Sequence, residues 1–201
     1  MRGNNLMTML NGQINEQKEK LLVLLKKEAL KIGEFVLSSG KTGSYYLDGR
    51  IITLTPEGAY LVASIILDLI KDLDIQAVGG PTLGADLIVG AVAVLSYINK
   101  FPIKTFIVRK AAKGHGMQRQ IEGPELKKNS RVILLDDVAT TGKAIIEAKA
   151  VLDDLGITVD RAIVIVDRQE GAKENLRQAG CSLESIFNIE DLGIKPKHTG
   201  E

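Results

Sequence analysis

The chain has 201 residues, of which 45% are hydrophobic and 25% charged, and its net charge is +1. These values are typical of one soluble globular domain and exclude the basic footprint of most nucleic-acid-binding proteins. The single cysteine, Cys181, excludes an internal disulfide and favours a reducing, cytoplasmic setting. The longest apolar run, 87–98, is too short to span a membrane. We therefore expect a cytoplasmic protein with no membrane or nucleic-acid partner.

A helix and a hairpin are expected at the amino-terminal end. Residues 1–15 are polar and unpatterned, and they lack the apolar core of a signal peptide. Residues 16–32 carry one apolar stripe at helical spacing, and Gly33 ends the predicted helix. Residues 35–50 read as two strands joined by a Ser/Gly/Lys turn. This hairpin is either a peripheral element with exposed tyrosines or part of a binding site.

Two strands with polar loops come next. Pro56 opens a helix, and 75–79 forms a short strand that leads through a glycine-rich turn into a helix over 85–98. A third strand, 104–108, delivers a loop over 109–123 with four basic residues, one histidine and three glycines. Such a run is commonly a solvated loop. Its place after a strand, where open α/β sheets bind ligands, and its glycines also suit a mobile lid for an anionic ligand.

The stretch 131–144 organises the chain. Val132–Asp136 reads as a strand buried on both faces, followed by a second acid, Asp137, and a small-residue turn over 139–142. The helix after this turn ends at Gly156. Backbone N–H groups at a helix start attract anions, so the junction suits a phosphate. The two acids then suit a sugar's hydroxyl groups or a metal ion; the alternative is an ordinary turn with two solvated acids.

A last core strand, 162–166, delivers Arg168 to the same edge of the sheet. Its planar guanidinium suits a carboxylate ligand, although a salt bridge to Asp167 or Glu170 would also explain it. A short helix over 172–179 and a strand over 182–188 complete the pattern. We predict an α/β fold in which a parallel sheet carries helices on both faces.

These motifs resemble type I phosphoribosyltransferases. The strand, the Asp136-Asp137 pair and Thr140-Thr141-Gly142 look like the family's signature for 5-phosphoribosyl 1-pyrophosphate (PRPP). In that family the two acids hold the ribose hydroxyls, the turn holds the 5-phosphate, and the loop matching 80–86 contacts the pyrophosphate. The hairpin (Phe-x-Leu-x-Ser-Gly, then Ser-Tyr-Tyr-x-Asp), the loop Arg-Lys-x-x-Lys-x-His-Gly and the Arg168 motif are similar to orotate phosphoribosyltransferases. There the hairpin forms a hood over the base.

The resemblance implies a role for each matching residue. The catalytic residues would be Lys113, His115, Asp136 and Asp137. Orotate would be bound by Thr140 and Arg168. PRPP would be bound by Arg109, Lys110, Lys113, His115, Asp136, Asp137, Val138, Ala139, Thr140, Thr141, Gly142, Lys143 and Ala144. The cofactor would be Mg²⁺, held mainly through PRPP, with no protein ligand assigned. Small departures from the family pattern occur at Ser38, Met117 and Lys143.

The activity implied is glycosyl (pentosyl) transfer from PRPP to orotate, giving orotidine 5′-monophosphate and pyrophosphate in de novo pyrimidine (UMP) biosynthesis. A homodimer with shared active sites is also implied, because in the family the lid of one subunit covers its partner's site. We expect one domain over 1–201, with a hood at about 16–55 and 181–195 and a core at about 56–180. Two alternatives stay open: a purine phosphoribosyltransferase, which should lack Tyr45-Tyr46 and Arg168, and a non-catalytic PRPP-binding regulator, which should lack the lid.

Overall fold

The computed structural model describes residues 2–36, 42–110 and 120–196. Its elements in chain order are α1 (Arg2–Leu24), a π-helical turn (Leu25–Ala29), β1 (Leu30–Val36), β2 (Thr42–Leu47), α2 (Arg50–Thr53), α3 (Pro56–Ile70), β3 (Ala77–Pro81), α4 (Gly84–Ile98), β4 (Lys104–Val108), β5 (Ile121–Glu122), β6 (Arg131–Ala139), α5 (Lys143–Asp154), β7 (Thr158–Asp167), α6 (Ala172–Gln178), β8 (Ser182–Asn188) and a 3-10 turn (Ile189–Leu192).

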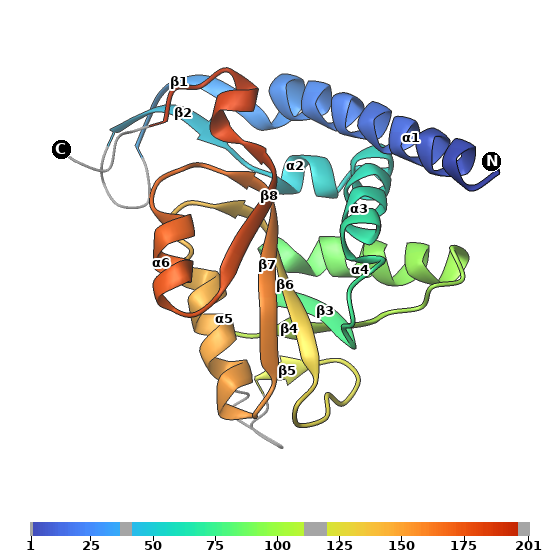
Figure 1. The fold of residues 1–201 in the computed structure, drawn as a ribbon. Coiled ribbons are helices and arrows are strands. Elements are labelled where there is room, and N and C mark those ends of the chain that lie inside the picture. The colour runs from blue at the N-terminus through green and yellow to red at the C-terminus, as the bar shows by residue number, and fades with distance from the viewer. Residues whose placement is uncertain (1, 37–41, 111–119, 197–201) are drawn as a thin grey trace.

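One central sheet carries the fold. Its strand order is β5-β4-β3-β6-β7-β8, and every neighbouring pair is parallel except β4 and β5. Helices α3 and α4 cover one face and α5 and α6 the other (Figure 1). The predicted α/β architecture is therefore confirmed. The antiparallel edge strand β5 was not predicted, because two residues are too few to show a period.

Successive side chains of β6 point alternately to the two faces of the sheet, so the strand contributes to both layers of the hydrophobic core. Ile133 and Leu135 pack on the side of α3 and α4, whereas Val132 and Leu134 pack on the side of α5 and α6. All four side chains are fully buried. This is the burial that a central parallel strand requires, and it explains why the strand reads as a continuous apolar run. It also fixes the direction in which the strand delivers the acids at its end.

The amino-terminal part differs from the sequence prediction. The helix begins at Arg2 rather than at residue 16, and it gives way to β1 at Leu30. The predicted stripe therefore breaks in two: Leu25 is fully buried, but Ile32 is 70% exposed. The physical reason is that residues from 30 onward pair antiparallel with β2, with Leu30 opposite Leu47. The start of β3 likewise lies at residue 77 rather than 75.

The small sheet β1-β2 and helices α1 and α2 lie together at one end of the central sheet (Figure 1). Helix α3 has a well-defined start. Thr55 caps it, because Thr55 Oγ1 accepts a hydrogen bond from Gly58 N at 3.1 Å, and Pro56 occupies its first turn. Within the described residues, every helix is too short or too polar to cross a lipid bilayer.

Candidate active site

Strand β6 carries both predicted acids into a cleft at the carboxyl edge of the sheet. The strand continues to Ala139, so Asp137 and Val138, predicted to follow the strand, belong to it. Asp136 Oδ1 accepts a hydrogen bond from Asp137 N at 3.0 Å, and Asp137 Oδ1 accepts one from Val138 N at 2.8 Å. These bonds fix the direction of both carboxylates while leaving oxygen lone pairs for a ligand.

The two carboxylates lie in an environment that disfavours charge. Asp136 is only 8% exposed, and its burial, together with the Asp137 carboxylate, raises its pKa to about 8. Burial also raises the pKa of Asp137, and the charge of Arg50 opposes that rise. Hydroxyl donors or a cation placed before the pair would stabilise the charged form of both acids. The site is therefore built to receive a partner of that kind.

An anion cradle follows the acids. A hollow of about 180 Å³ is lined by Asp136 and by residues 138–145. Gly142 occupies the left-handed region (φ 76°) directly before α5, and no side chain caps the helix start there. Asn175 Nδ2 donates to Thr141 O at 2.9 Å and so ties the turn to α6. Uncapped N–H groups at the start of a twelve-residue helix suit a phosphate.

The cradle opens into a larger cleft of about 310 Å³, and Thr140 lines both. Four elements of the central sheet contribute to the cleft, since the loops after β3, β4, β6 and β7 all reach it. The hairpin and α2 add the remaining wall. The lining residues are Tyr46, Leu47, Asp48, Arg50, Pro81, Thr82, Leu83, Gly84, Lys110, Asp136, Asp137, Val138, Thr140, Ala144 and Arg168.

Arg168 is held on one flank of this cleft. Its Nε donates to Tyr45 Oη at 2.9 Å, and the guanidinium lies 4.8 Å from the centre of the Tyr45 ring. Its NH2 group also pairs with Glu170 Oε1 at 2.8 Å. The salt bridge to Glu170 that the sequence left open is thus present, and it orients Arg168 at a position that still lines the cleft.

The loop after β4 is described only at its two ends. Lys110 lines the cleft, whereas Arg109 lines an adjoining hollow of about 200 Å³. Arg109 pairs with Glu122 at 3.1 Å, and its backbone N donates to Gln120 O at 2.8 Å, which joins the two ends of the loop. The predicted residues Lys113 and His115, and the departure Met117, lie outside the described residues.

Several cleft residues were not predicted as site residues. Asp48 and Arg50 form an ion pair at 2.8 Å beside the acids, and Gly84 lies so close to Asp136 and Asp137 that a methyl group would collide with both. The charge of Asp86 contributes to the raised pKa of Asp136, and Asp86 Oδ2 accepts a hydrogen bond from Thr82 Oγ1 at 2.9 Å. The sequence did contain a signal for Asp48 and Arg50, because a charged pair two residues apart follows the predicted second strand of the hairpin. The proximity of Gly84 to the acids left none.

Whether a metal ion fits this site depends on which side chains could act as its ligands. In the part of the chain that the structure describes, no group of three or more His, Cys, Asp or Glu side chains is arranged to hold a metal. Asp136 and Asp137 nevertheless present two carboxylates to one cleft. Mg²⁺ commonly binds through one or two carboxylates and completes its octahedron with substrate oxygens and water. The residues present therefore fit Mg²⁺ held mainly by a phosphorylated substrate.

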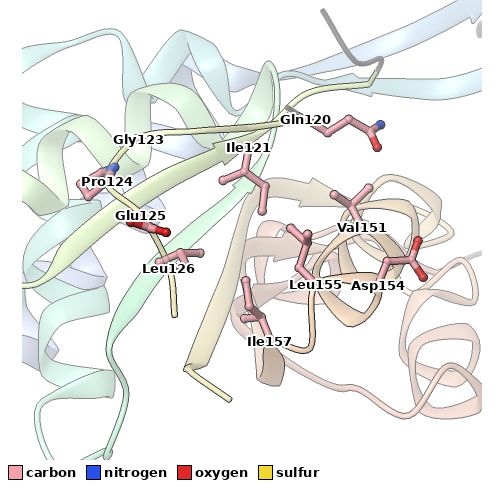
Figure 2. Close-up of a pocket in the computed structure, with 10 residues that line it drawn as sticks. All are labelled: Gln120, Ile121, Gly123, Pro124, Glu125, Leu126, Val151, Asp154, Leu155 and Ile157. Carbon is pink, nitrogen blue, oxygen red and sulfur yellow. The ribbon is translucent and has the colours of Figure 1, made fainter. Parts of the chain in front are cut away.

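A separate hollow of about 430 Å³ lies beside the carboxyl-terminal end of α5. Figure 2 shows Ile121 and Leu126 facing Val151, Leu155 and Ile157, and polar groups of Gln120, Glu125 and Asp154 also belong to its walls. It contains none of the predicted site residues.

The free thiol of Cys181 is not suited to catalysis. It is buried, and burial raises its pKa, which makes it a poor nucleophile.

Comparison with known proteins places the chain in a family. The model of the phosphoribosyl transferase domain matches residues 59–195. The chain is 46% identical over 189 residues to orotate phosphoribosyltransferase of Nostoc sp., covering 94% of this chain and 91% of that protein. It is 44% identical over 179 residues to the Aquifex aeolicus protein of the same name, covering 88% and 97%.

A solved structure agrees with these matches. Orotate phosphoribosyltransferase of Mycobacterium tuberculosis H37Rv, in complex with 5-phospho-alpha-D-ribosyl 1-diphosphate (PRPP), superposes with a TM-score of 0.74 at 31% identity. The match covers 89% of this chain and 99% of that one. The fold, the cleft and the sequence agreement over nearly the whole length lead to one conclusion: the chain belongs to the phosphoribosyl transferase family and, within it, to the orotate phosphoribosyltransferases.

Proposed function

We propose that this protein transfers the 5-phosphoribosyl group of PRPP to orotate, giving orotidine 5′-monophosphate and pyrophosphate. One observation carries the proposal: a single cleft joins an acid pair, a helix-start cradle and a braced arginine. An acid pair suits ribose hydroxyls, the cradle suits a 5-phosphate, and the arginine suits the carboxylate that distinguishes orotate from uracil. Membership of the orotate phosphoribosyltransferases supports the same substrates.

In this proposal PRPP binds at the middle of the carboxyl edge of the central sheet. Asp136 and Asp137 accept hydrogen bonds from the ribose 2- and 3-hydroxyls. The N–H groups and hydroxyls of residues 138–144 bind the 5-phosphate, and the uncapped start of α5 adds its dipole. The Mycobacterium tuberculosis relative was solved in complex with PRPP, which supports PRPP as the substrate. The acids and the cradle then hold C1 of the ribose over the open part of the cleft.

Orotate binds on the side of the cleft next to β7, where Arg168 lies. Thr140 lines the cleft between the cradle and Arg168, so one hydroxyl reaches both substrates. The guanidinium of Arg168 has five N–H groups, and the two named contacts with Tyr45 and Glu170 leave others for a carboxylate. Because these contacts fix the guanidinium before the base arrives, little conformational entropy is lost on binding.

The reaction exchanges one bond at C1 of the ribose. The C1–O bond to pyrophosphate breaks and its electron pair leaves with the pyrophosphate oxygen, so positive charge develops on the sugar. N1 of orotate forms the new C1–N bond, and the proton it carried passes to pyrophosphate or water. The leaving group gains negative charge, which Arg109, Lys110, Lys113 and His115 stabilise electrostatically. When bound, Mg²⁺ supplies further charge neutralisation on the phosphates.

We propose further that the protein acts in the cytoplasm as a homodimer whose lid residues complete the partner's site. An apolar face supports dimerisation: Val94, Tyr97 and Ile98 on α4 are 63%, 77% and 64% exposed, and Phe101 beside them is 40% exposed. Contiguous apolar surface of this kind marks an interaction site. We propose as well that the chain divides into a hood, about 16–55 and 181–195, and a core, about 56–180.

One assay tests the function. Orotate consumption is followed with PRPP and Mg²⁺, and hypoxanthine and uracil replace orotate as controls. The proposal predicts turnover with orotate and little with either control. Turnover with hypoxanthine would assign a purine phosphoribosyltransferase, and PRPP binding without turnover of any base would assign a regulator.

A further inference from the structure

A second arginine in the cleft is braced as firmly as Arg168. Arg50 Nε donates to Asp48 Oδ1 at 2.8 Å and Arg50 NH2 donates to Asp48 Oδ2 at 2.9 Å. The backbone N of Arg50 also donates to Asp48 Oδ1, at 3.0 Å. The Asp48 side chain is only 16% exposed, and the Tyr46 hydroxyl donates to its Oδ2 at 3.4 Å. A two-pronged pair of this kind fixes the plane of the guanidinium.

Arg50 and Arg168 lie on opposite flanks of the acid pair. Arg168 follows β7, which neighbours β6 on one side, whereas β3 neighbours β6 on the other. Helix α2, which Arg50 opens, packs against α4, the helix that follows β3. Gly49 lies directly against Asp137, since a Cβ at residue 49 would lie 2.9 Å from Asp137 Cβ. Arg50 therefore lies on the β3 side of the acids.

The turn on that side carries no cation. Residues 81–84 read Pro-Thr-Leu-Gly, and Leu83 is 57% exposed. Under the proposed function the diphosphate of PRPP lies between this turn and the acids, because the 5-phosphate takes the cradle and the base takes the β7 side. Of the described residues that line the cleft, only Arg50, Lys110 and Arg168 are basic. Arg50 thus joins Lys110, which follows β4, as a positive charge on the diphosphate side, and the pair with Asp48 fixes the position of Arg50.

We propose that Arg50 binds the diphosphate of PRPP and stabilises pyrophosphate as it leaves, and that Asp48 positions it. The inference rests on the proposed function and adds one contact residue and one positioning residue to it. Asp48 occupies two of the five N–H groups of the guanidinium, so three remain for phosphate oxygens. A charge held in place before the reaction requires no reorganisation when the leaving group becomes more negative.

Calorimetry with three probes tests the proposal, because the probes divide PRPP into its parts. Inorganic pyrophosphate and PRPP contain the diphosphate, whereas ribose 5-phosphate contains only the groups assigned to the acids and the cradle. In Arg50→Gln we expect affinity for PRPP and pyrophosphate to fall about ten- to hundredfold, and affinity for ribose 5-phosphate to stay unchanged. Arg50→Lys should lose less, because it retains the charge without the fork.

Arg177→Gln is the matched control. Arg177 makes the same two-pronged contact with Glu174, at 2.9 and 2.8 Å, but on exposed α6 outside the cleft, so its loss should alter none of the three affinities. Equal weakening of all three probes in Arg50→Gln, or no weakening, would overturn the inference; if that variant does not fold, Arg50→Lys must still weaken pyrophosphate more than ribose 5-phosphate. Failure of the proposed function is separate, since it appears as absent orotate turnover in the unaltered protein.

Discussion

Tyr45 and Arg168 are 123 residues apart in the chain, and the Arg168 Nε donates a hydrogen bond to the Tyr45 hydroxyl at 2.9 Å. The hydroxyl in turn donates to Glu170 Oε1 at 3.2 Å. Tyr45 is 3% exposed, so the hairpin reaches the core edge through a buried contact. This contact links the strand that carries the tyrosine pair to the arginine assigned to orotate.

Replacing Arg168 should weaken the binding of orotate without weakening that of PRPP. Arg168→Ala should raise the KM for orotate greatly, since truncating one partner of a buried charge pair costs about 2–5 kcal/mol. The KM for PRPP should change little, because its cradle lies at 138–144. Arg168→Lys should recover only part of the loss. Steady-state kinetics with each substrate varied in turn gives the answer, and an equal loss for both substrates would make Arg168 a structural residue.

Tyr45→Phe tests whether the bracing matters. The phenyl ring keeps the packing and the contact with the guanidinium but loses both hydrogen bonds of the hydroxyl. We expect the KM for orotate to rise about fivefold, which corresponds to about 1 kcal/mol, the typical net contribution of one hydrogen bond, with kcat and the KM for PRPP nearly unchanged. Tyr60→Phe, at a half-exposed position of α3 outside the cleft, is the control. An unchanged KM for orotate in Tyr45→Phe would show that Glu170 alone orients Arg168.

The acid pair gives a pH dependence of stability. The pKa of Asp136 rises from 3.8 to about 8 on folding, so the folded protein binds a proton more tightly than the unfolded chain in that window. Unfolding free energy should therefore fall as pH rises through the window. Acids held by arginines, such as Glu174 with a pKa of about 2, are already ionised there and add no slope.

Asp136→Asn should remove most of that slope. The measurement is urea unfolding between about pH 5 and pH 8 for both proteins. The variant should become the more stable of the two at the upper end, while its affinity for PRPP falls sharply. A slope that persists in Asp136→Asn would assign it to another group, and unchanged affinity for PRPP would contradict the role of the acid.

The sequence predicted the sheet and the strand–turn–helix junction that carries the acid pair, because both depend on local patterns. The run Val132–Asp136 and the turn after it define a buried strand and a helix start without further information. The hairpin was expected as a hood over the site only through the family resemblance, and the contacts that it makes with the sheet were not predicted. The contact of Gly49 with Asp137, and that of Tyr45 with Arg168, depend on how the hairpin docks on the sheet, which no local period encodes.

Gly84 is a second place where tertiary packing decides the site. A Cβ at this position would collide with Asp136 Oδ1 and lie 2.7 Å from Asp137 Oδ1, whereas at Gly90, on the same helix, it would meet nothing within 4 Å. Gly84→Ala should therefore displace the carboxylates and weaken PRPP binding by about tenfold or more. Gly90→Ala should leave binding unchanged. Calorimetry on both variants checks this, and equal affinities would mean that the acids relax without cost.

Complementation between two inactive chains tests whether the subunits share their active sites. A Lys113→Ala chain and an Asp136→Asn Asp137→Asn chain should each be nearly inactive alone. If the lid of one subunit acts on its partner, each heterodimer has one intact site, formed by the acids of the first chain and the lid of the second. Random co-refolding makes half of the dimers mixed, so about one quarter of the unaltered activity should return.

A lid that acts within its own subunit leaves no intact site in any of these dimers. The two outcomes therefore separate cleanly, provided that differently tagged chains prove that heterodimers have formed. The control is a mixture of the Asp136→Asn Asp137→Asn chain with a Lys173→Ala chain, whose substitution lies on α6 outside the cleft and which should be active before mixing. No recovery in a verified heterodimer of the two inactive chains would contradict shared sites, while orotate turnover by the unaltered protein would stand unaffected.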